Sequence, residues 1–80
     1  MRGVVHMSQE IRNRIDYTVI CISEFSQRHA MHPQQAYLYL KKYGGMAFLK
    51  DCYDAEHLLS IDAAVDDITA VCKRNGGKIA

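Results

Sequence analysis

The chain has 80 residues, of which 49% are hydrophobic and 24% charged, and its formal net charge is +1. This length allows one domain with a modest core, and the near-neutral charge gives no general attraction to nucleic acid or to an anionic membrane. The longest apolar runs are only a few residues, and the N-terminus lacks the apolar core of a secretory signal. These features predict a cytoplasmic protein with no membrane segment.

The first expected element is a long helix over residues 9–29, preceded by a flexible N-terminus over residues 1–7. Ser8 suits the N-cap, where its hydroxyl accepts a hydrogen bond from a backbone N–H of the first turn. Apolar residues then recur at steps of three and four, which predicts one buried face. That face comprises Ile11, Ile15, Val19, Ile22 and Phe25. Tyr17 and Ile20 fall on the opposite, polar face of this helix.

A second helix over residues 33–43 and a third over residues 46–53 are expected next. The residue before Pro33 is disfavoured in helical geometry, and proline itself suits the first helical position. Gly44 occupies the place where a left-handed residue ends a helix, a conformation that glycine adopts at little cost. Leu38 lies away from the apolar face of the second helix.

The last expected helix covers residues 61–75, with Ser60 at its N-cap. The preceding residues 54–59 are expected to form either a turn or one helical turn. Together these elements predict an all-α fold, a compact bundle of about four helices with short connections. The helical domain spans residues 8–77, and residues 78–80 form a tail.

The charge is unevenly distributed along the chain. Residues 51–67 carry six acidic side chains and no lysine or arginine, whereas residues 1–50 are net positive. Such a run is commonly a solvated face, and the sharper alternative is a docking surface for a basic partner. The acidic residues assigned to this candidate surface are Asp54, Glu56, Asp62 and Asp66.

The titratable side chains show no pattern typical of an enzyme or a metal site. His29 and His32 have helical spacing, but a break between helices is expected to separate them, so His29 is expected to be a hydrogen-bonded structural residue. The cysteines lie on or beside apolar faces, where burial raises the pKa of a thiol. They are Cys21, Cys52 and Cys72, an odd number that argues against a disulfide framework. We therefore predict no enzymatic activity, no metal and no cofactor.

The segment from residue 33 to residue 53 loosely resembles a helix-turn-helix, and Lys41, Lys42 and Lys50 lie within it. The helix in the recognition position is short and apolar and carries Asp51. It offers no arginine, asparagine or glutamine to read the edges of bases. A DNA-binding regulator is therefore the alternative prediction, and nucleic acid is not the expected partner.

Protein binding is the function that the sequence favours over DNA binding. Tyr17, Ile20 and Leu38 are apolar residues on predicted polar faces, and they join into one patch if the first two helices lie side by side. A contiguous exposed apolar patch marks an interface. The sequence thus predicts a protein–protein interaction module that binds another protein or a second copy of itself, and it shows no sign of a small-molecule substrate.

Several short motifs add a resemblance to this interpretation. They are Ala36-Tyr37, Lys42-Tyr43-Gly44, Tyr53-Asp54, His57, Ser60-Ile61 and Val65-Asp66-Asp67-Ile68. Through them, residues 9–77 resemble a family of small bacterial domains of unknown function, DUF3791. The family pattern tends to read His-Thr after the Tyr-Asp turn, whereas Leu58 follows His57 here. The resemblance implies a cytoplasmic all-α bacterial protein. Domains of this family tend to sit beside ADP-ribosyltransferase-like proteins, which implies an accessory or antitoxin-like role for this one.

Overall fold

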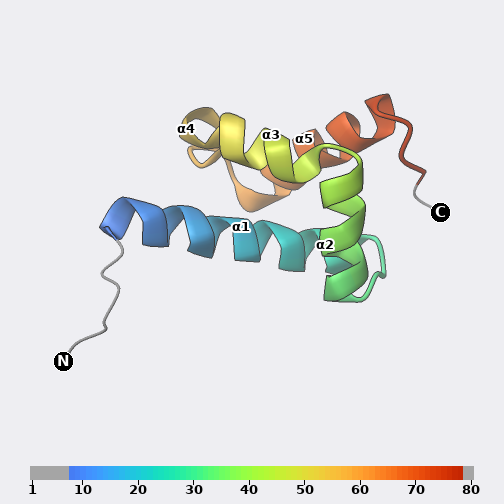
Figure 1. Cartoon of the computed structure of the whole chain (residues 1–80), viewed down its shortest axis with the longest axis horizontal. Coiled ribbons are helices and arrows are strands. Elements are labelled where there is room, and N and C mark those ends of the chain that lie inside the picture. Colours follow the sequence, from blue (N-terminus) through green and yellow to red (C-terminus); the bar gives the residue numbers. More distant parts are fainter. Residues whose placement is uncertain (1–7, 79–80) are drawn as a thin grey trace.

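In the computed structural model, which describes residues 8–78, the chain forms α-helices joined by short turns (Figure 1). The helices are α1 (Gln9–Arg28), α2 (Pro33–Lys42), α3 (Gly45–Asp51), α4 (Tyr53–Glu56) and α5 (Ile61–Arg74). The all-α prediction is confirmed, and the four expected helices begin and end within two residues of their predicted bounds. For residues 54–59 the sequence allowed either a turn or one helical turn, and the short α4 is that helical turn.

The expected flexible segment at residues 1–7 lies outside the described residues, as does most of the expected tail at residues 78–80. Within the described part of the chain, no helix is both long enough and apolar enough to cross a bilayer.

Side chains fix the starts of the two longest helices. The Ser8 hydroxyl accepts a hydrogen bond from the backbone N–H of Ile11 at 3.1 Å, and the Ser60 hydroxyl accepts one from Ala63 at 3.1 Å. Each bond satisfies an N–H group that has no partner within its own helix. Both predicted N-caps are therefore confirmed.

The start of α2 is fixed by a capping box around His32. The imidazole Nδ1 accepts a hydrogen bond from the N–H of Gln34 at 3.3 Å, and the N–H of His32 donates to the side-chain oxygen of Gln35 at 3.2 Å. Pro33 follows at the first helical position, where it loses no hydrogen bond. These contacts separate α2 sharply from α1.

The helices are arranged around α1. α2 runs across the C-terminal end of α1, and α3, α4 and α5 return along one side of it (Figure 1). α1 packs against α2 and α5, and α3 packs against both α2 and α5. The core between them is built from Tyr17, Cys21, Phe25, Ala36, Leu40, Leu49, Ala64, Val65, Ile68 and Cys72.

The buried face of α1 differs from the predicted one. Tyr17, Cys21 and Phe25, spaced four residues apart, are buried in the core. The residues predicted to form the core in the first half of the helix are instead half exposed: Ile11 at 49%, Ile15 at 46% and Val19 at 58%. The predicted face is therefore rotated from the buried one by about one residue, or roughly 100°. The placement of Tyr17 on a polar face was wrong.

The C-terminal turn closes the fold against the α2–α3 turn. Asn75 donates a side-chain hydrogen bond of 2.8 Å to the carbonyl oxygen of Tyr43, directly before Gly44. Gly44 has a φ of +84°, which confirms the predicted left-handed residue. Gly77 is buried next to the Tyr39 ring, where an added Cβ would lie 2.3 Å from the Tyr39 hydroxyl. The last described residues are thus part of the packed structure.

Gly45, the first residue of α3, allows the closest approach between α3 and its neighbours. A Cβ at this position would lie 2.7 Å from Leu40 Cδ2, 3.1 Å from Cys72 Sγ and 3.2 Å from Ile68 Cγ2. All three side chains are fully buried, so none of them can move into solvent to make room.

A Gly45→Ala variant tests this contact. Replacing a helical glycine by alanine ordinarily raises the free energy of unfolding by about 0.5–1 kcal/mol. Here the added methyl group overpacks the core, and we expect that free energy to fall by about 1–3 kcal/mol. Urea denaturation followed by circular dichroism measures the difference. An increase in stability would show that α3 is not held this close to α5.

Candidate functional site

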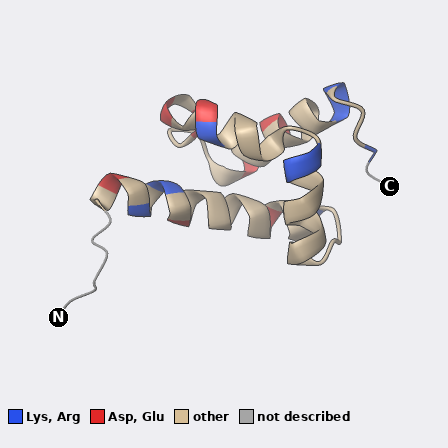
Figure 2. Cartoon of the chain, viewed as in Figure 1, with Lys and Arg blue, Asp and Glu red and all other residues tan. Residues whose placement is uncertain are grey.

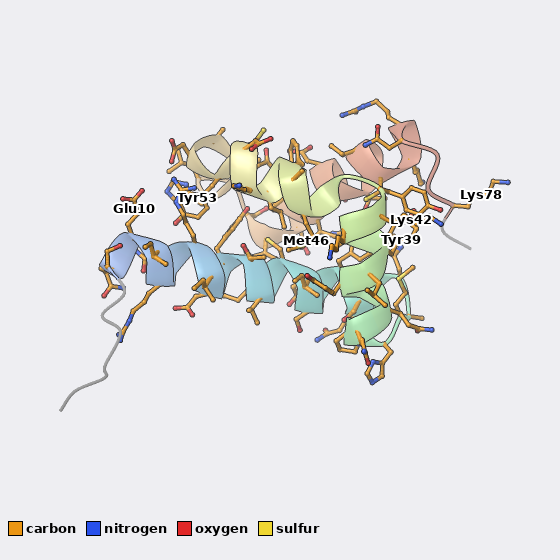
Figure 3. All side chains as sticks on the ribbon, in the orientation of Figure 1. Glu10, Tyr39, Lys42, Met46, Tyr53 and Lys78 are labelled. Atoms are coloured by element: carbon orange, nitrogen blue, oxygen red, sulfur yellow. The ribbon has the colours of Figure 1, made fainter. Side chains whose placement is uncertain are left out.

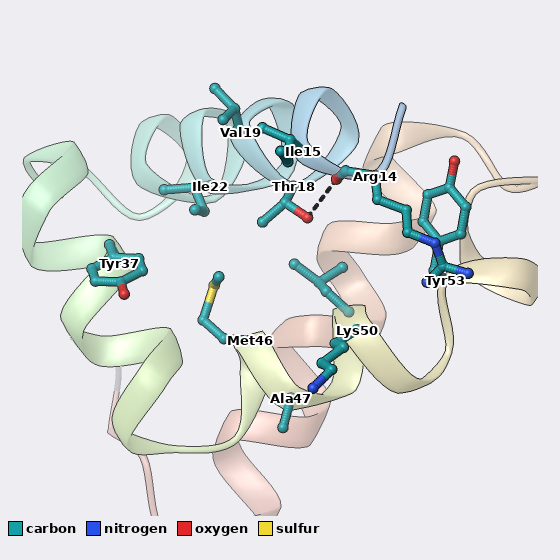
Figure 4. Close-up of a pocket in the computed structure, with 11 residues that line it drawn as sticks. Arg14, Ile15, Thr18, Val19, Ile22, Tyr37, Met46, Ala47, Lys50 and Tyr53 are labelled. Carbon is teal, nitrogen blue, oxygen red and sulfur yellow. Dashed lines mark hydrogen bonds between the residues drawn. The ribbon is translucent and has the colours of Figure 1, made fainter. Parts of the chain in front are cut away.

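An apolar groove lies between α1 and the α2–α3 segment. Its volume is about 500 Å³, and Figure 4 shows the side chains around it. The groove exists because α2 crosses α1 only at its C-terminal end, so the earlier turns of α1 face α3 across open space. The residues that line it are Arg14, Ile15, Thr18, Val19, Ile22, Tyr37, Met46, Ala47, Leu49, Lys50 and Tyr53.

The walls of the groove are almost entirely apolar. Ile15 and Val19 form the α1 wall, and Tyr37, 40% exposed, reaches it from α2. Met46 and Tyr53 lie in the space between α1 and the α3–α4 segment (Figure 3). The Thr18 hydroxyl donates a 2.8 Å hydrogen bond to the carbonyl oxygen of Arg14, so it is already satisfied. The groove therefore offers contact area rather than polar chemistry.

Both charged residues that line the groove are basic. The Arg14 guanidinium carbon lies 4.5 Å from the centre of the Tyr53 ring, and its Nη2 lies 3.4 Å from Glu10 and 3.6 Å from Asp54. The side chain is thus held against the end of the groove. Lys50 is exposed, and no carboxylate among residues 8–78 forms a salt bridge with it.

The three predicted apolar contact residues are not brought together. Tyr17 is buried and packs edge-to-face on Tyr53 with ring centres 5.5 Å apart, so it cannot serve as an exposed contact. Ile20 and Leu38 are exposed, at 47% and 56%, but neither lines the groove. The exposed apolar residues that line the groove are instead Ile15, Val19 and Tyr37.

A comparison with family profiles agrees with the resemblance that the sequence motifs indicated. A family profile described as protein of unknown function (DUF3791) matches residues 16–75. The chain belongs to this family. The match confirms the resemblance found in the sequence. It includes Val19 but not Ile15 of the α1 wall, and all of α2 and α3. Neither a curated protein nor a solved structure matches the chain.

The predicted acidic surface of this DUF3791 member is divided. Acidic positions are spread over α3, α4 and α5 (Figure 2). Asp54 faces Arg14 near the start of α1, as described above. Asp62 and Asp66 both form salt bridges with Arg28 near the end of α1. Because these carboxylates are engaged at opposite ends of α1, they do not form one continuous dock for a basic partner.

Glu56 is the exception in the acidic set, because it is only 7% exposed. Its placement on an acidic surface was therefore wrong. The Oε1 atom is buried with no hydrogen-bond partner among the described residues. Burial, and then the nearby carboxyl of Asp67, raise the pKa of Glu56 above its ordinary value. The charged form of this side chain is disfavoured in the folded protein.

His29, Cys21 and Cys72 of this family member have structural surroundings. His29 Nε2 lies 3.2 Å from the Thr69 hydroxyl, which confirms the expected hydrogen-bonded histidine. Burial raises the pKa of the Cys21 and Cys72 thiols, as expected for cysteines on apolar faces. Over residues 8–78, no three His, Cys, Asp or Glu side chains gather in a way that could hold a metal ion.

The sequence contained one signal for the groove that the prediction did not use. Tyr17, Cys21 and Phe25 follow a spacing of four, directly beside the stripe that contains Ile15 and Val19. Two adjacent apolar stripes make a helix apolar over more of its surface than one core contact requires. The second stripe therefore indicated an additional surface on α1.

The buried Glu56 predicts a pH dependence of stability. As the pH rises from the ordinary carboxyl pKa to the raised value, the unfolded chain loses its proton before the folded chain does, so the free energy of unfolding decreases. Glu56→Gln keeps the shape and removes this titration. We expect the variant to lose that part of the decrease as the pH rises above the ordinary carboxyl pKa of about 4.3. Urea denaturation across this range, with the exposed Glu24→Gln as the matched control, measures it. An unchanged pH profile in Glu56→Gln would contradict the prediction.

Proposed function

We propose that this DUF3791 member is a cytoplasmic protein-interaction module that acts by binding rather than by catalysis. The observation that carries the proposal is the groove of about 500 Å³ with half-exposed Ile15, Val19 and Tyr37 on its walls. Single exposed apolar side chains are common on proteins, but apolar side chains that converge on one concavity are typical of binding surfaces.

The energetics favour an apolar segment of a protein as the occupant. Covering apolar surface contributes about 25 cal/mol per Å² removed from water. An elongated apolar groove between helices is commonly filled by a helix or an extended segment that presents apolar residues on one side. The groove lies beside Arg14 and Lys50, so an acidic residue at the margin of such a segment would be favoured there.

The accessory or antitoxin-like role implied by the family resemblance is a specific form of this proposal. In that form, the partner in the groove is an enzyme that acts near this protein in the cell. The three cysteines, none in a disulfide, suit a reducing compartment such as the cytoplasm.

DNA binding is the alternative, and the α2–turn–α3 arrangement is the observation that favours it. α3 has seven residues, of which Leu49 is buried and Phe48 half-buried. Ala47, Lys50 and Asp51 remain exposed for contact with DNA, and only one of them is basic. This surface supports a base-reading role less well than the groove supports protein binding.

The groove proposal is tested by retention of proteins from the native host on the immobilised chain, followed by reconstitution with the purified partner. We expect Val19→Glu to abolish binding, because it places a charge on the apolar wall. Leu58→Glu is the matched control, since Leu58 is 78% exposed and outside the groove. Reconstituted binding that is equally strong in Val19→Glu would refute the proposal, as would a chain that binds neither a host protein nor a second copy of itself.

The DNA alternative is tested by fluorescence anisotropy with a labelled duplex at low salt. Binding to phosphates weakens steeply as salt is added, so a DNA-binding protein gives a salt-sensitive signal. We expect no change in anisotropy at low salt. A salt-sensitive signal lost in Lys50→Ala would favour the α2–turn–α3 segment as a DNA contact instead.

A further inference from the structure

We propose that the partner on the groove face is a second copy of the chain, with the two α1 helices packed antiparallel and Ile15 on the twofold axis. This inference rests on the proposed function, because it names the occupant of the same face. It follows from three features of α1: the spacing of its exposed apolar residues, the charges beside them and the position of the groove.

The exposed residues of α1 form a ridge that is symmetric about its centre. Ile11, Ile15 and Val19 are spaced four residues apart and are 49%, 46% and 58% exposed. If Ile15 lies on a twofold axis perpendicular to α1, Ile11 packs against Val19 of the partner subunit, and the reverse contact occurs as well. In an antiparallel pair whose axes cross at a shallow angle, a stripe with this spacing stays in contact along its length. The same three residues are thus complementary to a copy of themselves.

The charges beside the ridge support the antiparallel direction. Arg12 and Asp16 lie along the edge of the ridge that faces away from the groove, on the opposite side from Arg14. In the antiparallel pair, Arg12 lies about two residues, or about 3 Å along the axis, from Asp16 of the partner subunit. The twofold axis makes this contact twice. Neither side chain is in a salt bridge within residues 8–78, so both are available.

The groove lies along the other edge of the ridge. The same twofold axis therefore places the two grooves face to face and encloses them between the subunits. A stable interface buries about 800 Å² on each partner, and three half-exposed side chains supply only part of that area. Tyr37 and Lys50, which border the groove from α2 and α3, extend the contact beyond α1.

Sedimentation equilibrium of the purified chain over micromolar to millimolar concentrations tests the assembly. We expect a mass approaching twice the 9.1 kDa of one chain. In Val19→Glu, the dissociation constant is expected to rise by at least about tenfold, while Leu58→Glu leaves it unchanged. Circular dichroism shows whether each variant is folded. A monomer at every concentration, or a dimer unaffected by Val19→Glu, would overturn the inference.

Charge reversal tests the antiparallel pairing. Arg12→Glu alone and Asp16→Arg alone each place like charges together, and both are expected to weaken the dimer. The double variant Arg12→Glu/Asp16→Arg exchanges the charges and is expected to restore it. If the double variant is as weak as the single variants, the antiparallel α1 pairing is wrong.

Disulfide cross-linking tests the position of the axis. In a Cys52→Ser background, which removes the half-buried native cysteine, Ile15→Cys is expected to give a covalent dimer on mild oxidation. Gln27→Cys, near the far end of α1, is the matched control and is expected to stay uncross-linked. Equal cross-linking at both positions would overturn the assignment of Ile15 to the axis.

A monomeric protein that still binds a host partner through the groove would overturn this inference alone and leave the proposed function standing.

Discussion

The length of α1 is the constraint on which the rest of the structure depends. α1 has 20 residues, whereas α2 has 10 and α5 has 14. A helix of this length spans about 30 Å, and the helices that pack against it cannot cover its whole circumference along that distance. The core therefore takes one side of α1, with Tyr17, Cys21 and Phe25, and leaves a second apolar stripe in contact with solvent. The groove is a direct result of this mismatch.

Apolar packing, rather than charge, holds α1 to α5. Arg28 forms salt bridges from α1 to α5, and its partners Asp62 and Asp66 are both highly exposed. Ion pairs of this kind contribute about 0–1 kcal/mol, so they orient the helices more than they stabilise them. Phe25 of α1 and Val65 and Ile68 of α5 are fully buried in the shared core, and their burial stabilises the packing of the helices.

Local signals made the helix boundaries predictable, but not the faces of α1. Ser8, Pro33, Gly44 and Ser60 act on neighbouring backbone groups, so the sequence specifies their effects without reference to the fold. The buried side of α1 depends on how far α2 and α5 extend along it, which is a property of the assembled molecule. The acidic composition of residues 51–67 likewise did not show which carboxylates are buried. Glu56 is buried, whereas Asp54, two positions earlier, is exposed.

The closure of the C-terminal turn has a consequence for how the protein is made. Asn75 and Gly77 complete the packing around Tyr43 and Tyr39, and α5 supplies four of the ten core residues. During synthesis, the first two helices therefore emerge from the ribosome with their apolar faces uncovered. Folding of the whole unit must wait until residues 75–77 have left the ribosome. During that interval the apolar side of α1 is accessible to other proteins before α5 covers it.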